Sequence, residues 1–97
     1  MIDRAFARRI AAEHIEEGCA TADGVTPVIV DDQTIEEDFG WIFFYQSREY
    51  LDTRDFGLSL AGNAPLIVDR RDGSIHETGT AMPVGHYIET YRRARVR

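Results

Sequence analysis

The most apolar stretch of the chain runs from Phe39 to Gln46 and contains the single tryptophan, three phenylalanines and a tyrosine. In a β-strand, successive side chains point to opposite faces. One face of this run is expected to carry Phe39, Trp41, Phe43 and Tyr45. The other face would carry Ile42 and Phe44. Because a half-solvated strand alternates apolar with polar residues, the pattern predicts a central strand with both faces covered.

Three shorter β-prone runs accompany it, namely Pro27–Val30, Leu66–Val68 and Ser74–Glu77. Between the last two, the Asp72-Gly73 pair is a strong hairpin signal, because glycine readily adopts the positive φ of a tight hairpin turn. The four strands, taken in order, predict an antiparallel meander.

A helix is predicted from about Arg4 to Glu17, with Asp3 as its N-cap and Gly18 after its end. Its apolar face is expected to comprise Ile2, Ala5, Phe6, Ile10, Ala12 and Cys19. Polar residues interrupt this stripe, which favours packing on a sheet over burial on all sides. His14 falls on the polar side and is expected to be solvated or to act as a cap.

A second helix is predicted near the C-terminus, with Pro83 in its first turn, where the missing N–H does no harm. Its buried face has the i, i+3, i+4, i+7 spacing of Val84, Tyr87, Ile88 and Tyr91. Residues 47–64 lack a regular period and are expected to contain a short turn of helix or to carry function. Three apolar residues would return this segment to the core: Phe56, Leu58 and Leu60.

Together these elements predict one α+β domain over residues 1–97, with an N-terminal helix, a four-stranded antiparallel meander sheet and a C-terminal helix. The net charge of -6 argues against a nucleic-acid binder, whose affinity depends on clustered cations. No apolar run approaches the roughly 20 residues that cross a bilayer, and no secretory signal is visible. We therefore expect a cytoplasmic protein with no membrane partner.

The sequence contains no motif that indicates catalysis. It lacks a phosphate-binding glycine loop, a Gly-x-Ser-x-Gly elbow and a His-Glu-x-x-His motif. The three histidines have no metal-ligand spacing, and the single cysteine, Cys19, is expected to be a small packing residue rather than a nucleophile. We expect a protein that is not an enzyme and needs no cofactor.

Two polar segments flank the ends of the aromatic strand. The first is acidic and comprises Asp31, Asp32, Glu36, Glu37 and Asp38. The second offers Arg48, Tyr50 and Asp52. Charge runs are commonly solvated connections between elements. The alternative is that these carboxylates crowd one rim of the sheet and form a docking edge for a cationic partner.

Several motifs follow one another in order through roughly residues 25 to 91. They are Gly40-Trp41-Ile42-Phe43-Phe44-Tyr45, Leu60-Ala61-Gly62-Asn63-Ala64-Pro65-Leu66-Ile67-Val68-Asp69, Asp72-Gly73-Ser74, Gly79-Thr80, Pro83 and Tyr87-Ile88-Glu89-Thr90-Tyr91. This succession resembles the immunity protein 35 (YrhB-like) family. The motifs are structural, so they identify a fold family better than an activity.

The resemblance implies a small bacterial protein that is encoded beside a polymorphic toxin, often of a papain-like peptidase type, and neutralises that cognate toxin by direct binding. Recognition is then expected at the two polar segments, that is at Asp31, Asp32, Glu36, Glu37, Asp38, Arg48, Tyr50 and Asp52. Trp41 is expected in the core. The competing interpretation is a small chaperone-like or regulatory binding module, with a homodimer favoured if only one layer of helices covers the sheet.

Overall fold

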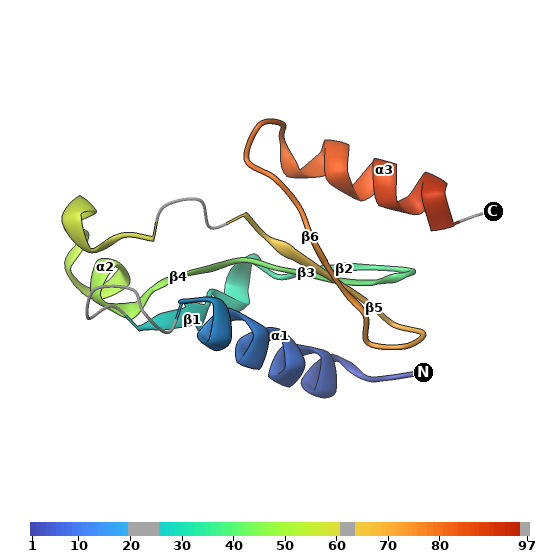
Figure 1. Cartoon of the computed structure of the whole chain (residues 1–97), viewed down its shortest axis with the longest axis horizontal. Helices are drawn as coiled ribbons and strands as arrows, with labels where there is room; N and C mark the ends of the chain where they lie inside the picture. The colour runs from blue at the N-terminus through green and yellow to red at the C-terminus, as the bar shows by residue number, and fades with distance from the viewer. Residues whose placement is uncertain (20–25, 61–63, 96–97) are drawn as a thin grey trace.

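The computed structural model describes residues 1–19, 26–60 and 64–95. Its centre is a four-stranded antiparallel sheet in the order β2-β3-β5-β6 (Figure 1). The strands are β2 (Ile35–Glu37), β3 (Gly40–Phe43), β5 (Leu66–Asp69) and β6 (Ile75–Glu77). Each strand pairs antiparallel with the next in this order, which confirms the predicted α+β meander.

The aromatic run is divided between two sheets. Its first part is β3, and its end forms β4 (Tyr45–Ser47), which pairs with β1 (Pro27–Ile29) in a separate two-stranded sheet. The 3-10 helix η1 (Asp31–Gln33) joins β1 to β2, so these two strands pair with successive parts of the same run. The first strand of the meander is therefore β2, and the predicted strand at Pro27–Val30 belongs to the smaller sheet.

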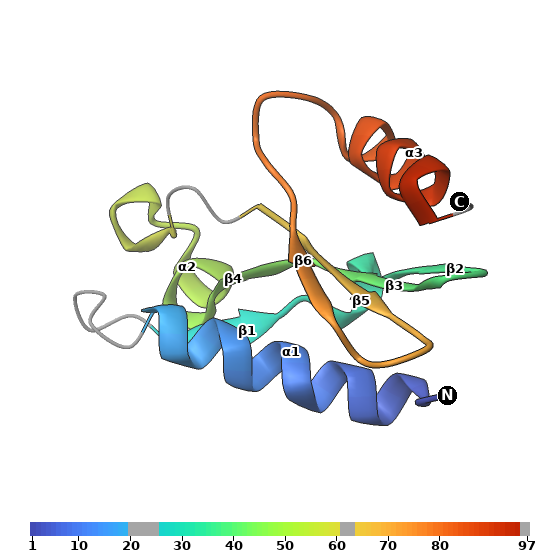
Figure 2. The same ribbon diagram turned by 45° about the vertical axis from the view of Figure 1, so that its right-hand side comes forward.

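One helix covers each face of the four-stranded sheet (Figure 1 and Figure 2). These helices are α1 (Arg4–Cys19) and α3 (Val84–Arg95). The core on the α1 side consists of Ala7, Ala11, Ile15, Ile29, Trp41, Phe43, Leu66 and Val68. The core on the α3 side consists of Phe39, Ile42, Ile67 and Ile88. Both faces of β3 are thus buried, and Trp41 lies in the core as predicted. Because helices cover both faces of the sheet, the condition under which a homodimer was favoured, a single layer of helices, is not met.

Phe39 lies on the opposite face from the one predicted. Residues 38–39 form a turn, and the strand begins only at Gly40, which has a φ of +153°. Because the chain turns here, the alternation of β3 does not extend back to Phe39. Its ring packs on the α3 side instead, with its centroid 5.1 Å from that of Tyr91.

Helix α1 starts as predicted, and its buried face agrees with the predicted one only in part, since Ile2, Ile10 and Ala12 pack against the core. The Asp3 carboxylate accepts a 2.8 Å hydrogen bond from the N–H of Phe6, as expected of an N-cap. The buried residues of the helix are Ala7, Ala11 and Ile15. Phe6 and Ala5, predicted to face the sheet, are exposed. The small alanines let α1 approach the sheet closely, whereas the large Phe6 is left at the surface.

The long segment after β4 contains a short helix, as predicted. Helix α2 (Arg48–Thr53) begins after Ser47, whose hydroxyl oxygen accepts a 2.9 Å hydrogen bond from the N–H of Tyr50. The 3-10 helix η2 (Phe56–Leu58) follows. Phe56 does not return to the core, because its side chain is 80% exposed. We call residues 48–58 the α2–η2 end of the molecule.

The β5–β6 hairpin and α3 agree with the predictions. Gly73 has a φ of +73° in the hairpin turn. The face of α3 toward the sheet carries Val84, Ile88 and Tyr91, with Tyr87 half-buried beside them. The Tyr91 hydroxyl donates a 2.5 Å hydrogen bond to the buried carboxylate of Asp69 in β5. This contact fastens α3 to the centre of the sheet.

Candidate partner-binding surface

Asp31 is paired within the chain. Arg8 of α1 donates from Nε and Nη2 to the two carboxylate oxygens of Asp31, at 2.7 and 3.0 Å. These hydrogen bonds from Arg8 hold the pKa of Asp31 below its usual value, because they stabilise the ionised carboxylate. The pair ties α1 to η1, so this carboxylate already has an intramolecular role.

Glu36 and Glu37 lie in β2, an edge strand of the four-stranded sheet, rather than in a solvated connection. Arg70 pairs with Glu36 at 3.0 Å, and its guanidinium carbon lies 4.7 Å from the ring centroid of Trp41. Glu37 is paired with Arg92 of α3. Arginines therefore offset much of the mutual repulsion that this acidic edge would otherwise have.

The structure does not bring all eight predicted recognition residues together. Asp38 lies in the turn between β2 and β3, where its side chain is 82% exposed and 3.8 Å from Arg92. Arg48 and Asp52 are exposed on α2, at the opposite end of the sheet (Figure 1). The acidic residues of β2 and its turn therefore lie apart from the exposed charged residues of α2.

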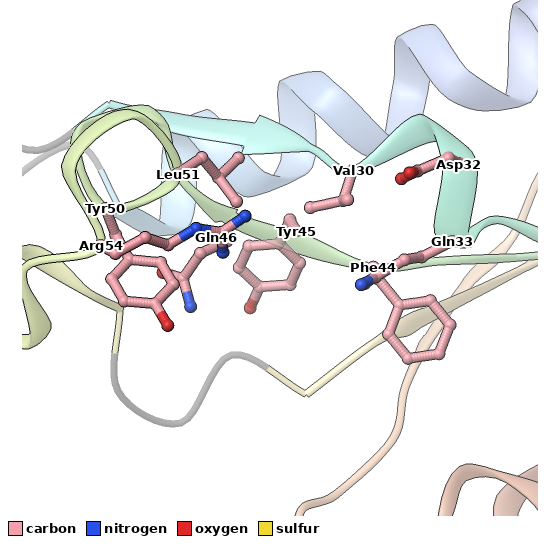
Figure 3. A pocket seen from close by; sticks show the side chains of 9 residues that line it. All are labelled: Val30, Asp32, Gln33, Phe44, Tyr45, Gln46, Tyr50, Leu51 and Arg54. Carbon is pink, nitrogen blue, oxygen red and sulfur yellow. The ribbon is translucent and has the colours of Figure 1, made fainter.

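Asp32 and Tyr50, one from each predicted segment, line a single pocket of about 370 Å³ (Figure 3). The pocket lies where η1, β4 and α2 meet. Its lining residues are Val30, Asp32, Gln33, Phe44, Tyr45, Gln46, Tyr50, Leu51 and Arg54. Figure 3 shows Asp32 at one end of the group, with Tyr50 and Arg54 at the other.

Arg54 is a pocket residue that the sequence interpretation missed. It ends α2 in the left-handed conformation, with a φ of 60°, and its N–H donates a 2.6 Å hydrogen bond to the carbonyl of Tyr50. Its guanidinium carbon lies 5.5 Å from the centroid of the Tyr50 ring. No sequence pattern marked this arginine, because its place in the pocket depends on η1, far earlier in the chain.

A second, smaller pocket of about 210 Å³ lies between β6 and α3. It is lined by Ile67, His76, Glu77, Thr78, Tyr87, Thr90, Tyr91 and Ala94. The hydroxyls of Thr78 and Thr90 donate to backbone carbonyls, and that of Tyr87 accepts from the N–H of Met82. Because these hydroxyls already make hydrogen bonds within the chain, this pocket has fewer groups available to hydrogen-bond a ligand than the first pocket.

Within residues 1–19, 26–60 and 64–95, no three His, Cys, Asp or Glu side chains are grouped so that they could bind a metal ion. His14 of α1 lies 3.0 Å from the Glu77 carboxylate of β6, so it contacts the sheet instead of pointing freely into solvent. The predicted packing role of Cys19 concerns a side chain that lies outside the described part of the structure. None of the helices in the same ranges has the length and apolar character of a membrane span.

Comparison with known proteins agrees with the resemblance of the sequence motifs. The family model of immunity protein 35 matches residues 5–93. The uncharacterized protein YrhB of Escherichia coli (strain K12) is 42% identical over 71 residues, which cover 71% of this chain and 72% of that protein. No solved structure matches the chain. Since the family model spans nearly the whole sequence, the chain belongs to the immunity protein 35 family.

Proposed function

We propose that this protein binds a cognate toxin directly and neutralises it, and that the α2–η2 end makes the contact. Membership of the immunity protein 35 family supports the immunity role. The family resemblance implies that such toxins are often papain-like peptidase or related domains. The observation that carries the choice of surface is the 80% exposure of Phe56, whose ring centroid lies 5.7 Å from that of Tyr50.

Phe56 is held in position although it is exposed. The Asp55 carboxylate accepts a 2.9 Å hydrogen bond from the N–H of Gly57, and the Ser59 hydroxyl donates a 2.8 Å hydrogen bond to the carbonyl of Phe56. A side chain on a fixed backbone loses less conformational entropy on binding than one on a loose loop. An exposed aromatic ring beside a tyrosine and an arginine also matches the composition of interface hot spots. Phe56, Tyr50 and Arg54 therefore suit an anchor for a protein partner.

Three of the predicted recognition residues besides Tyr50 lie near this end of the molecule without an ion pair within the described residues. Asp32 lies at the pocket, and Arg48 and Asp52 are exposed on α2. By contrast, Asp31, Glu36 and Glu37 are paired with arginines of the same chain. We therefore move the predicted recognition site away from the β2 edge, where binding would have to break existing ion pairs, to the α2–η2 end.

The test is co-expression with the product of the neighbouring toxin gene, followed by pull-down and a growth assay. We expect the full chain to co-purify with the toxin and to restore growth. Phe56→Ala should weaken the complex by at least about 10-fold, as expected for loss of an aromatic hot spot. Met82→Ala removes another exposed apolar side chain, 48% exposed, outside this surface and should leave the affinity unchanged.

Two results would overturn the proposal. If no toxin is bound and growth is not restored, the immunity role by direct contact is wrong. If Phe56→Ala and Met82→Ala bind the toxin equally well, the α2–η2 end is not the contact surface. Equal solubilisation of unrelated unfolded proteins would favour the chaperone-like alternative.

A further inference from the structure

The amide of Gln46 has a fixed orientation in the pocket between η1 and α2. Its Oε1 accepts hydrogen bonds from the N–H groups of Ser47, at 2.8 Å, and Leu60, at 2.7 Å. An amide oxygen has two lone pairs, so these two donors occupy both and settle which end of the amide carries nitrogen. The NH2 group is left as a donor, and nothing in the described part of the chain accepts a hydrogen bond from it.

Arg54 supplies a positive charge at the same end of the pocket (Figure 3). Among the described residues, Arg8, Arg70, Arg71 and Arg92 each lie within ion-pair distance of a carboxylate. No described carboxylate lies within that distance of Arg54, which contacts the ring of Tyr50 instead. Its guanidinium therefore has hydrogen-bond donors available for a ligand.

Tyr50 lines the same end of the pocket (Figure 3), where its ring centroid lies 5.5 Å from the guanidinium carbon of Arg54, so its hydroxyl adds a third donor to this end. A guanidinium, an amide NH2 and a phenol hydroxyl are three donors, one of them charged, and a carboxylate offers the matching acceptors. Asp32 at the opposite end adds a negative charge that would repel a ligand with several anionic groups. The pocket thus favours one carboxylate at the Arg54 end.

We infer that this pocket binds an aspartate or glutamate side chain of the partner protein, with its carboxylate on Arg54, Gln46 and Tyr50. The inference deepens the proposed function and rests on it. The pocket volume of about 370 Å³ is small, which fits a short protruding segment of a partner. Phe56 does not line the pocket, but its ring centroid lies 5.7 Å from that of Tyr50, which does. Because the chain has a net charge of -6, an acidic group is repelled by most of its surface, so this pocket would fix the orientation of the partner.

The experiment measures the affinity of the full chain for the cognate toxin by calorimetry, with three variants of matched design. Arg54→Gln removes the charge and keeps a similar side-chain length, and we expect it to weaken binding about 10-fold to 100-fold. Tyr50→Phe keeps the ring and removes only the hydroxyl, with a smaller loss of a few-fold expected. Arg93→Gln makes the same charge change on the exposed surface of α3 and should leave the affinity unchanged.

Substitutions on the toxin identify the bound group. Its exposed aspartates and glutamates are replaced one at a time by asparagine and glutamine in the complex with each variant. The inference requires one position whose replacement weakens binding to the wild-type chain and to Arg93→Gln, but has no further effect on Arg54→Gln. Far-UV circular dichroism of each variant shows whether the fold is kept.

Titration of the chain with free glutamate and with acetate, followed by NMR, tests whether the carboxylate bound in the pocket belongs to a small molecule instead of a partner protein. Shifts at Gln46 and Arg54 that disappear in Arg54→Gln, together with unchanged toxin binding by that variant, would assign the pocket to a small molecule and overturn the inference. Equal toxin affinity of Arg54→Gln and Arg93→Gln would also overturn it while leaving the proposed function intact. If the wild-type chain binds no toxin, the proposed function itself fails, and this inference with it.

Discussion

At the scale of single residues, Gly40 decides where the aromatic strand begins. Its φ of +153° is unfavourable for any residue with a side chain, and an added Cβ would lie 2.0 Å from the carbonyl oxygen of Val68 in β5. That oxygen belongs to a paired strand and cannot move aside. We expect Gly40→Ala to lower the free energy of unfolding by about 3 kcal/mol or more, as measured by urea denaturation.

The matched control for this prediction is Gly85→Ala in α3. A Cβ at Gly85 would meet no atom within 4 Å, and alanine is the better helix former. This variant should be unchanged or more stable by up to about 1 kcal/mol. A Gly40→Ala protein as stable as Gly85→Ala would show that the strand start is not under the constraint described.

Single residues also show what sequence reasoning could predict. The alternation of Trp41, Ile42 and Phe43 was sufficient to place their side chains on two buried faces. The same alternation failed at Phe39, because the chain turns at residues 38–39 and Gly40 has a positive φ, which an alternation of apolar and polar positions does not register. The most buried positions of α1 were missed since Ala7 and Ala11 are small, and hydrophobic patterns give more weight to large side chains such as Phe6.

At the scale of elements, α1 is tied to η1 by the Arg8–Asp31 pair, and this tie depends on pH. The hydrogen bonds from Arg8 lower the pKa of Asp31 in the folded chain. The contribution to stability is therefore complete above the unfolded-state value of about 4 and is lost as pH falls through the lower folded value. Since the two side chains are 44% and 59% exposed, it should stay below about 1 kcal/mol.

The measurement compares urea denaturation of the wild type and Asp31→Asn across the acidic range. We expect the wild type to be more stable near neutral pH, and the difference to disappear well below about pH 4. High salt should reduce the difference at neutral pH, because both groups are solvent-accessible. A difference that persists unchanged in acid would mean that ionisation of Asp31 does not contribute.

The candidate site was only partly predictable because it is assembled from separate elements. Asp32 and Tyr50 were selected from the sequence as polar residues near the two ends of the aromatic run, and the structure places both at one pocket. Gln46 was counted only as the last residue of that run. The N–H of Leu60 helps to fix the orientation of the Gln46 amide, and so the direction of its NH2 group. A contact between residues this far apart in the chain leaves no local sequence pattern.

At the scale of the whole molecule, the net charge of -6 does not show which carboxylates are paired and which are free to attract a partner. The carboxylates of Asp31, Glu36 and Glu37 face arginines. The exposed carboxylates include Asp52 and Asp55 at the α2–η2 end and Glu13, Glu16 and Glu17 on α1. Net negative charge raises the rate at which a positively charged partner is captured, and this effect acts over distances that salt screens. The field should thus steer the toxin, and short-range contacts at Phe56 and Arg54 should then retain it.

If long-range charge captures the toxin and short-range contacts retain it, salt should affect the association rate constant and the dissociation rate constant differently. If the toxin surface is positive, the association rate should fall by about 10-fold or more between low and physiological ionic strength, while the dissociation rate changes little. Phe56→Ala should do the reverse, with a faster dissociation and a nearly unchanged association rate, because an uncharged ring adds nothing to the long-range field. Stopped-flow mixing at several salt concentrations separates the two constants. An association rate independent of salt would exclude steering by the acidic surface, and a Phe56→Ala effect confined to association would exclude Phe56 as an anchor.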